Sequence, residues 1–127
     1  MTTAARRDFR EYHLRREAAE QALRESERQE LLAQVREAVS RFAPLHPAIR
    51  RVYVFGSLLK PGRFSRRSDV DLAVDCDQVE SETPFWRDLE RALRRNVDLR
   101  PRLGTVAEAV AAHGEFCYAR QSDPPRG

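Results

Sequence analysis

The spacing of apolar positions divides the chain into helical and strand-like segments. Between residues 31 and 42, apolar side chains recur three or four positions apart and share one face of a helix. Two later runs, residues 51–55 and 69–75, are short and rich in β-branched or aromatic residues, which is typical of strands. The pattern therefore predicts a mixed α/β protein, of the α+β class.

The remaining elements follow from residue type and turn signals. Residues 6–30 hold good helix formers without Gly or Pro, so we expect a helix that continues, or nearly continues, into residues 31–42. Pro84 suits the first turn of a helix that runs to about Arg95, and Asn96 is expected to end it in a left-handed turn. The other predicted segments are a connector at 43–49, a loop at 58–68, a polar connector at 76–83, a strand at 97–100, a helix at 105–113 and a last strand at 115–119.

Length suggests a single small domain. The chain has 127 residues, enough for one hydrophobic core. We divide it into an N-terminal helical extension at residues 1–30, a folded domain at residues 31–119 and a disordered tail at residues 120–127. The extension has few apolar positions, and we expect it to pack back on the domain, to form an oligomer or to bind a partner.

Charge and composition narrow the class of protein. The 23 basic residues exceed the 20 acidic ones by only three, and most are arginines interleaved with glutamates, which is typical of solvated helix faces. This small excess of positive charge does not decide whether the protein binds nucleic acid directly. No apolar run reaches the roughly 20 residues of a membrane span, and the first residues contain no apolar segment typical of a signal peptide, so we expect a cytoplasmic protein. Cys76 and Cys117 lack the spacing of a zinc site and are read as reduced core residues.

Two carboxylates stand inside the strand-like run 69–75. Because side chains alternate between the faces of a strand, Asp69 and Asp71 share one face and the apolar residues share the other. Like charges this close repel each other unless a cation lies between them. Mg²⁺ is the best fit, since it is usually held by one or two carboxylates together with substrate phosphates.

The strand-like run 51–55 ends in Gly56-Ser57. A glycine there leaves backbone N–H groups open, and these groups with a serine hydroxyl can hold a phosphate. Asp98 lies in a third strand-like segment. If the three strands are neighbours, three carboxylates and a phosphate site face one cleft, which suits in-line displacement at phosphorus with two metal ions. Asp98 is then the expected base for an attacking hydroxyl.

These residues resemble the signature of the DNA polymerase β nucleotidyltransferase superfamily, in particular its minimal nucleotidyltransferase (MNT) domains. Gly56, Ser57, Asp69, Asp71 and Asp98 match its Gly-Ser, Asp-x-Asp and later Asp. The resemblance covers about residues 31–119 and implies a small mixed β-sheet flanked by helices. The spacing departs from the family pattern by one extra residue between the Gly-Ser and the Asp pair.

The resemblance also implies an activity. Such enzymes move a nucleoside monophosphate from a nucleoside triphosphate to a hydroxyl, using two Mg²⁺ ions. In the family the first two aspartates bind metal and the third helps to activate the acceptor. It implies ATP as substrate, and a nucleotide site made by the Gly-Ser together with Lys60, Arg63 and Ser68. Many stand-alone MNT proteins are antitoxins that pair with a HEPN ribonuclease toxin, and some adenylylate it.

Other readings stay open. The acceptor hydroxyl could belong to a small molecule or an RNA, or the chain could block a toxin by contact without catalysis. Arg63, Arg66 and Arg67 either hold the triphosphate or an acidic acceptor, or form a solvated loop. The three histidines show no metal spacing and are expected to be structural.

Overall fold

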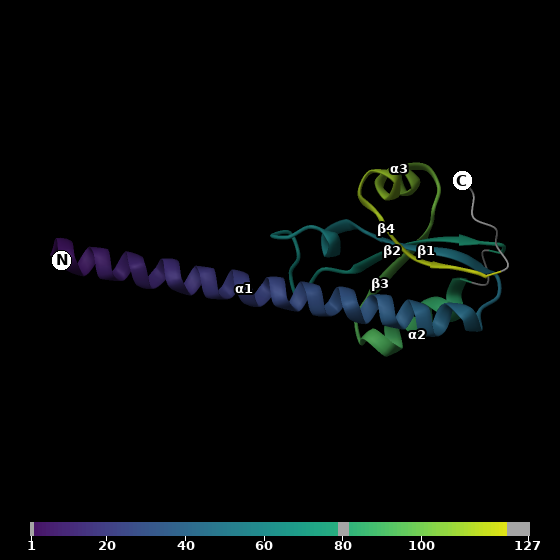
Figure 1. Cartoon of the computed structure of the whole chain (residues 1–127), viewed down its shortest axis with the longest axis horizontal. Coiled ribbons are helices and arrows are strands. Elements are labelled where there is room, and N and C mark those ends of the chain that lie inside the picture. Colours follow the sequence, from purple (N-terminus) through teal and green to yellow (C-terminus); the bar gives the residue numbers. More distant parts are fainter. Residues whose placement is uncertain (1, 79–81, 122–127) are drawn as a thin grey trace.

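A single long helix begins the chain. The computed structural model describes residues 2–78 and 82–121, and its first element, α1 (Thr3–Phe42), joins the two predicted helices into one of 40 residues. Thr2 caps it, since its Oγ1 accepts a hydrogen bond of 3.2 Å from the N–H of Ala5. The N-terminal half projects away from the rest of the molecule (Figure 1), and the first buried side chain is Arg28.

Four strands form one mixed sheet. Their order is β3-β2-β1-β4, in which β1 pairs antiparallel with both β2 and β4, and β2 pairs parallel with β3. The bounds are β1 (Ile49–Phe55), β2 (Val70–Cys76), β3 (Val97–Pro101) and β4 (Glu115–Ala119). The predicted small mixed sheet flanked by helices is confirmed.

Short helices connect the strands. They are η1 (Ala43–Leu45), η2 (Gly56–Leu59), α2 (Glu82–Leu93) and α3 (Gly104–His113). The predicted left-handed turn at Asn96 is wrong: α2 ends two residues earlier than expected, and Arg94 takes the positive φ of 51°. In Figure 1, α1 and α2 lie on one side of the sheet and α3 on the other.

The hydrophobic core lies between the sheet and the pair α1 and α2. Alternate residues of β1, β2 and β3 face it, because side chains of a strand point to opposite faces in turn. The helices contribute apolar residues spaced three or four apart. The fully buried side chains include Val35, Val39, Ile49, Val52, Val54, Leu58, Val70, Leu72, Val74, Phe85 and Leu89.

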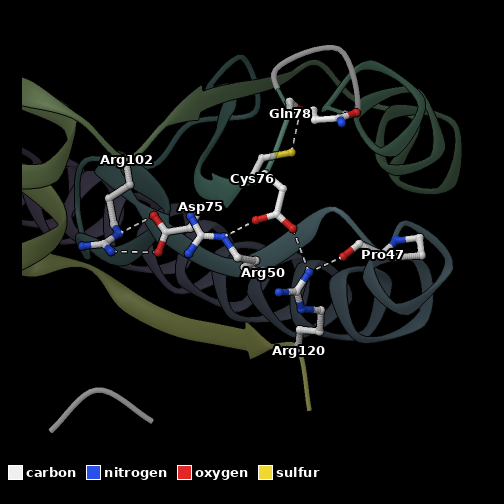
Figure 2. A network of polar contacts seen from close by, with 8 residues as sticks. Pro47, Arg50, Asp75, Cys76, Gln78, Arg102 and Arg120 are labelled. Atoms are coloured by element: carbon white, nitrogen blue, oxygen red, sulfur yellow. Dashed lines mark hydrogen bonds and ion pairs between the residues drawn. The ribbon is translucent and has the colours of Figure 1, made fainter. Parts of the chain in front are cut away.

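A network of ion pairs fastens the end of the sheet where β1 begins and β2 and β4 end (Figure 2). Arg102 holds Asp75 through two hydrogen bonds of 2.9 and 2.8 Å. Arg50 and Arg120 both pair with Asp77 at 2.9 Å, and Arg120 also donates to the carbonyl of Pro47. These contacts secure the sheet at the end away from Gly56.

Some sequence predictions fall outside the described residues. Residues 79–81 of the predicted connector and residues 122–127 of the predicted tail are not described. The division at residue 30 stays a prediction. Within residues 2–78 and 82–121, no helix combines the length and the apolar character that crossing a membrane requires.

Candidate active site

Two of the three predicted aspartates lie side by side in the sheet. The parallel register of β2 and β3 places Asp71 opposite Asp98. Each follows a buried valine in its strand, Val70 and Val97, so both side chains point away from the core and toward the α3 side. The sheet therefore brings together carboxylates that are 27 positions apart in the sequence.

Gly56 lies directly against Asp71. The antiparallel register pairs Phe55, the last residue of β1, with Asp71, and the chain then turns into η2. Gly56 has a φ of +82°, which side chains rarely allow, and a Cβ at this position would collide with Oδ2 of Asp71. Only glycine fits between the turn and the carboxylate, so the two predicted parts of the site are contiguous.

The third predicted carboxylate joins the same electrostatic cluster. Asp69 is exposed and lies one residue before β2. The pKa of Asp71 is raised above its ordinary value, first by burial and then by the negative charges of Asp98 and Asp69, while Arg100 opposes the rise. The negative charges of Asp98 and Asp69 thus both act on Asp71.

Arg100 neutralises part of that charge. Its Nη2 lies 2.8 Å from Oδ2 of Asp98, on the same face of β3, because residues two apart in a strand point the same way. The hydrogen bond to Asp98 raises the pKa of Arg100. Arg100 therefore acts as the cation that now partners Asp98.

The donor set fits a hard divalent cation. Carboxylate oxygens are the ligands that Mg²⁺ prefers, and a cation here would relieve the repulsion that raises the pKa of Asp71. In the part of the chain described, no three acidic, His or Cys side chains are already grouped as a complete ligand set. The ion pair between Asp98 and Arg100 explains why Asp98 does not join such a ligand set, because its carboxylate is turned toward the guanidinium.

The residues predicted to bind nucleotide are spread along one loop. Ser57 lies in the first turn of η2, where backbone N–H groups lack partners within the turn, and its carbonyl accepts from the N–H of Lys60 at 3.0 Å. Arg63 is exposed. Ser68 is engaged within the loop, because its Oγ accepts from the N–H of Ser65 at 3.0 Å. Ser68 directly precedes Asp69, but among the described residues no hydrogen bond or ion pair joins the side chain of Lys60, Arg63 or Ser68 to an aspartate side chain.

Arg66 is turned away from the aspartates. Its guanidinium makes two hydrogen bonds to Glu27 of α1, of 3.2 and 2.8 Å, which ties the loop to the helix. Of the three loop arginines, Arg66 is therefore engaged in a structural contact, and Arg67 is exposed.

Arg28 supports the Gly-Ser turn, and the sequence reading did not single it out. Its side chain is buried, and it donates a hydrogen bond of 2.9 Å to the carbonyl of Leu58 in η2. Glu25 holds the same guanidinium from one turn earlier in the helix. Its position three residues before Leu31, on the core face of α1, was the available signal.

Arg95 supports the loop before Asp69 in the same way. Its guanidinium donates to the carbonyls of Ser68, Ser65 and Arg66 at 3.0, 3.1 and 2.7 Å. It also lies 5.3 Å from the ring centre of Phe64. No sequence pattern pointed to Arg95, because its partners are backbone carbonyls about thirty residues away.

Cavities near the loop do not contain the aspartates. Spaces of about 430 Å³ and 450 Å³ lie between α1 and the loop 61–67 and are lined by residues of both. Asp69 by contrast is exposed at the surface. Asp71 and Asp98 are half-buried at the sheet, and none of the three aspartates lines these two cavities.

Comparisons with solved structures support the fold. Two structures align with 68% of this chain and 74% of their own, each with a TM-score of 0.55. One is a mutant MntA–HpeT toxin–antitoxin complex with 22% identity, and the other a toxin–antitoxin structure with AMP-PNP and 26% identity. A third, at 21% identity and a TM-score of 0.49, contains a tri-AMPylated HEPN toxin from Shewanella oneidensis with an MNT antitoxin, over 72% of this chain and 74% of that one.

Sequence comparison assigns the family. No curated protein matches the chain. The family described as polymerase beta, nucleotidyltransferase, matches residues 37–122, which is more than half of the chain and includes Gly56, Asp71 and Asp98. The chain therefore belongs to the polymerase beta nucleotidyltransferase family, as the resemblance of its motifs predicted, and its fold is similar to that of chains in two toxin–antitoxin structures.

Proposed function

We propose that this protein transfers AMP from ATP to a hydroxyl on a partner protein, in a reaction that depends on Mg²⁺, and acts as antitoxin of a HEPN ribonuclease toxin. The observation that carries the proposal is the register of Asp71 opposite Asp98, with Gly56 directly against Asp71. Membership of a nucleotidyltransferase family supports the chemistry. The related toxin–antitoxin structures support the biological role.

Each residue has a role in this scheme. Asp69, Asp71 and Asp98 would hold the metal, and bound Mg²⁺ would neutralise the triphosphate and orient the attacking oxygen. The Gly56-Ser57 turn would hold the phosphates through backbone N–H groups and the serine hydroxyl. Lys60, Arg63 and Ser68 remain candidates for further nucleotide contacts.

The reaction is a displacement at the α-phosphorus. The acceptor oxygen forms a bond to that phosphorus, the bond to the bridging oxygen of the β-phosphate breaks, and pyrophosphate leaves. Asp98 takes the proton of the acceptor hydroxyl. For this, Asp98 must first leave its ion pair with Arg100, so Arg100 is placed to turn toward the negative triphosphate instead.

A protein acceptor suits the exposure of the site. Asp69 is open to solvent, and the cavities beside α1 do not include the aspartates. A small acceptor needs an enclosing pocket to be held in place. A macromolecule can instead bring its hydroxyl to an open surface.

The test uses the chain with a HEPN-type toxin. The two proteins are incubated with Mg-ATP, and the toxin is examined by mass spectrometry for added AMP. We expect labelling by the natural sequence and none by the double variant Asp69→Asn, Asp71→Asn. Glu108→Gln, an exposed residue of α3, is the matched control and should label normally.

The alternatives give different outcomes. Toxin inhibition without AMP addition, or equal labelling by the double variant, would replace catalysis by inhibition through contact. An RNA acceptor would appear as label on RNA, with steep salt dependence from phosphate contacts. A small-molecule acceptor would take the label in a low-molecular-weight fraction while the toxin stays unmodified.

A further inference from the structure

Among the described residues, none buries the N-terminal half of α1, and only its end, at Glu20 and Leu23, borders the cavity beside the loop 61–67. From Thr3 to Leu23 every residue is exposed, and the helix projects beyond the domain (Figure 1). Large apolar side chains are exposed along it: Phe9 and Leu14 at 58%, Tyr12 at 56% and Leu23 at 53%. Such residues on a bare helix are unusual unless another surface covers them.

Except for Leu14, which falls on the opposite side, these apolar residues form a stripe along one side of the helix. Ala5, Phe9, Tyr12, Ala19 and Leu23 follow one another at steps of three, four or seven residues, which is the seam of a heptad repeat. Arg16 occupies the one seam position between Tyr12 and Ala19. Bulky residues alternate with small or polar ones along this seam. Such a seam contributes little to the stability of a helix pair, but it restricts which helix can pair with it.

The charges of the same helix are divided into two blocks of opposite sign. Residues 6–16 contain five arginines and two acids, a net charge of +3, while residues 17–30 contain five glutamates and two arginines, a net charge of −3. The positive block lies nearer the helix N-terminus, and the first turn has no acidic residue. That order opposes the helix dipole, so negative charge from outside would stabilise this end.

We propose that residues 5–23 of α1 pair with the same segment of a second copy of this chain, in antiparallel orientation. Antiparallel pairing places the positive block of each helix beside the negative block of the other. Parallel pairing would place like charges together. Charge complementarity within one segment therefore selects both the partner and the direction.

The seam fixes a register. When Phe9 lies opposite Ala19 of the second copy, Ala5 lies opposite Leu23 and Tyr12 opposite Arg16, so each layer joins a large side chain to a small one, or a ring to a guanidinium. In the same register Arg6 lies near Glu20 of the second copy, and Arg10 near Glu17. The overlap is about 27 Å long at 1.5 Å per residue.

Most of this overlap lies beyond the domain. Arg28 is the first buried residue of α1, and only the end of the paired segment, at Glu20 and Leu23, borders the cavity beside the loop 61–67. Few apolar layers are available, and much of the attraction is between exposed charges. The dimer should therefore be reversible and should weaken as salt rises. This inference does not depend on the proposed activity.

The first test measures the mass of the full-length chain by analytical ultracentrifugation at low and high salt. We expect dimer at low salt and high protein concentration, shifting to monomer in high salt. The variant Phe9→Glu, Leu23→Glu should be monomeric, with an unchanged core by near-UV circular dichroism. A natural chain that stays monomeric at low salt overturns the proposal, and so does a double variant that still forms the dimer.

The second test addresses direction. One chain carries Arg6→Glu, Arg10→Glu and the other carries Glu17→Arg, Glu20→Arg. Antiparallel pairing predicts that each variant alone is monomeric and that an equimolar mixture regains the dimer. If either variant dimerises alone as well as the natural chain does, or if the mixture stays monomeric, the antiparallel pairing is wrong.

Discussion

Asp71 on β2 lies opposite Asp98 on β3 in a parallel register, and each is turned away from the core by the buried residues beside it. The pairing costs electrostatic free energy, because burial and the charge of Asp98 both raise the pKa of Asp71. Hydrophobic residues at these two positions would be less costly to the fold. The arrangement is therefore better explained by the binding of a cation than by stability.

Gly56 offers a direct test of the contact between the turn and the acid. We expect Gly56→Ala to lower the free energy of unfolding and to abolish nucleotide binding, because the added Cβ meets the Asp71 carboxylate. Gly62→Ala is the matched control, since Gly62 has a φ of +84° but nothing within 4 Å of the added atom. The backbone conformation alone should cost about 1–2 kcal/mol. Equal losses in the two variants, measured by urea unfolding, would argue against the contact.

Asp71→Asn should separate stability from function. Since the pKa of Asp71 is raised in the folded state, the native protein binds this proton more tightly than the unfolded chain does. The stability linked to this group is present at low pH and is lost as pH rises from about 4 through the raised pKa. We therefore expect the variant, in EDTA at neutral pH, to melt at a higher temperature than the natural chain. Thermal scans across pH check this, and the difference should shrink toward low pH.

Magnesium should reverse the order of the two melting temperatures, so that the natural chain melts above Asp71→Asn. We expect added Mg-ATP to raise the melting temperature of the natural chain but not of Asp71→Asn, because only the former keeps the ligand set. A variant that Mg-ATP stabilises as much as it does the natural chain would remove Asp71 from the site.

Arg28 should link the long helix to the Gly-Ser turn. Arg28→Met keeps the apolar stem and removes the hydrogen bond to the Leu58 carbonyl. We expect a loss of about 1.5–3 kcal/mol in the free energy of unfolding, as for other hydrogen bonds to charged groups. Hydrogen exchange in η2 should also become faster. Arg87→Met, an exposed arginine of α2, is the control and should change neither quantity.

Arg95 should position the loop that leads to Asp69. Replacing Arg95 by Met removes its three hydrogen bonds to loop carbonyls. We expect faster hydrogen exchange across residues 63–69, together with a lower rate of AMP transfer. Arg95→Lys, which keeps the charge but not the planar fork, should recover only part of the protection. Unchanged exchange in the loop of Arg95→Met would contradict this role.

The redox state of the two cysteines, Cys76 and Cys117, could be predicted from residue type and spacing. Their spacing indicated reduced core residues. Both thiols are free, but both residues are only partly buried and pack against the edge of the core. Burial raises the pKa of Cys117 to about 11, so this thiol stays protonated at neutral pH. Residue type and spacing were enough here, because the prediction needed no distant partner.

The sequence by itself determined the elements and the class of chemistry. Helical spacing, β-branched runs and turn residues are local signals, and they placed the strands and helices to within a few residues. The alternation of Asp71 with buried residues is also local, as is the glycine at the end of β1. From these signals the fold and the candidate aspartates could be predicted.

Only the tertiary structure decided which charged residues serve that site. In a chain where 34% of residues are charged, nothing local distinguishes Arg66 and Arg95, and only its place on the core face of α1 distinguishes Arg28. Their partners are a carbonyl or a carboxylate some thirty to forty residues away. Packing of α1 and the register of the sheet bring these groups together, and hydrogen bonds act only over about 3 Å. The sequence could therefore indicate the aspartates, but the residues that hold them in place became visible only in the folded chain.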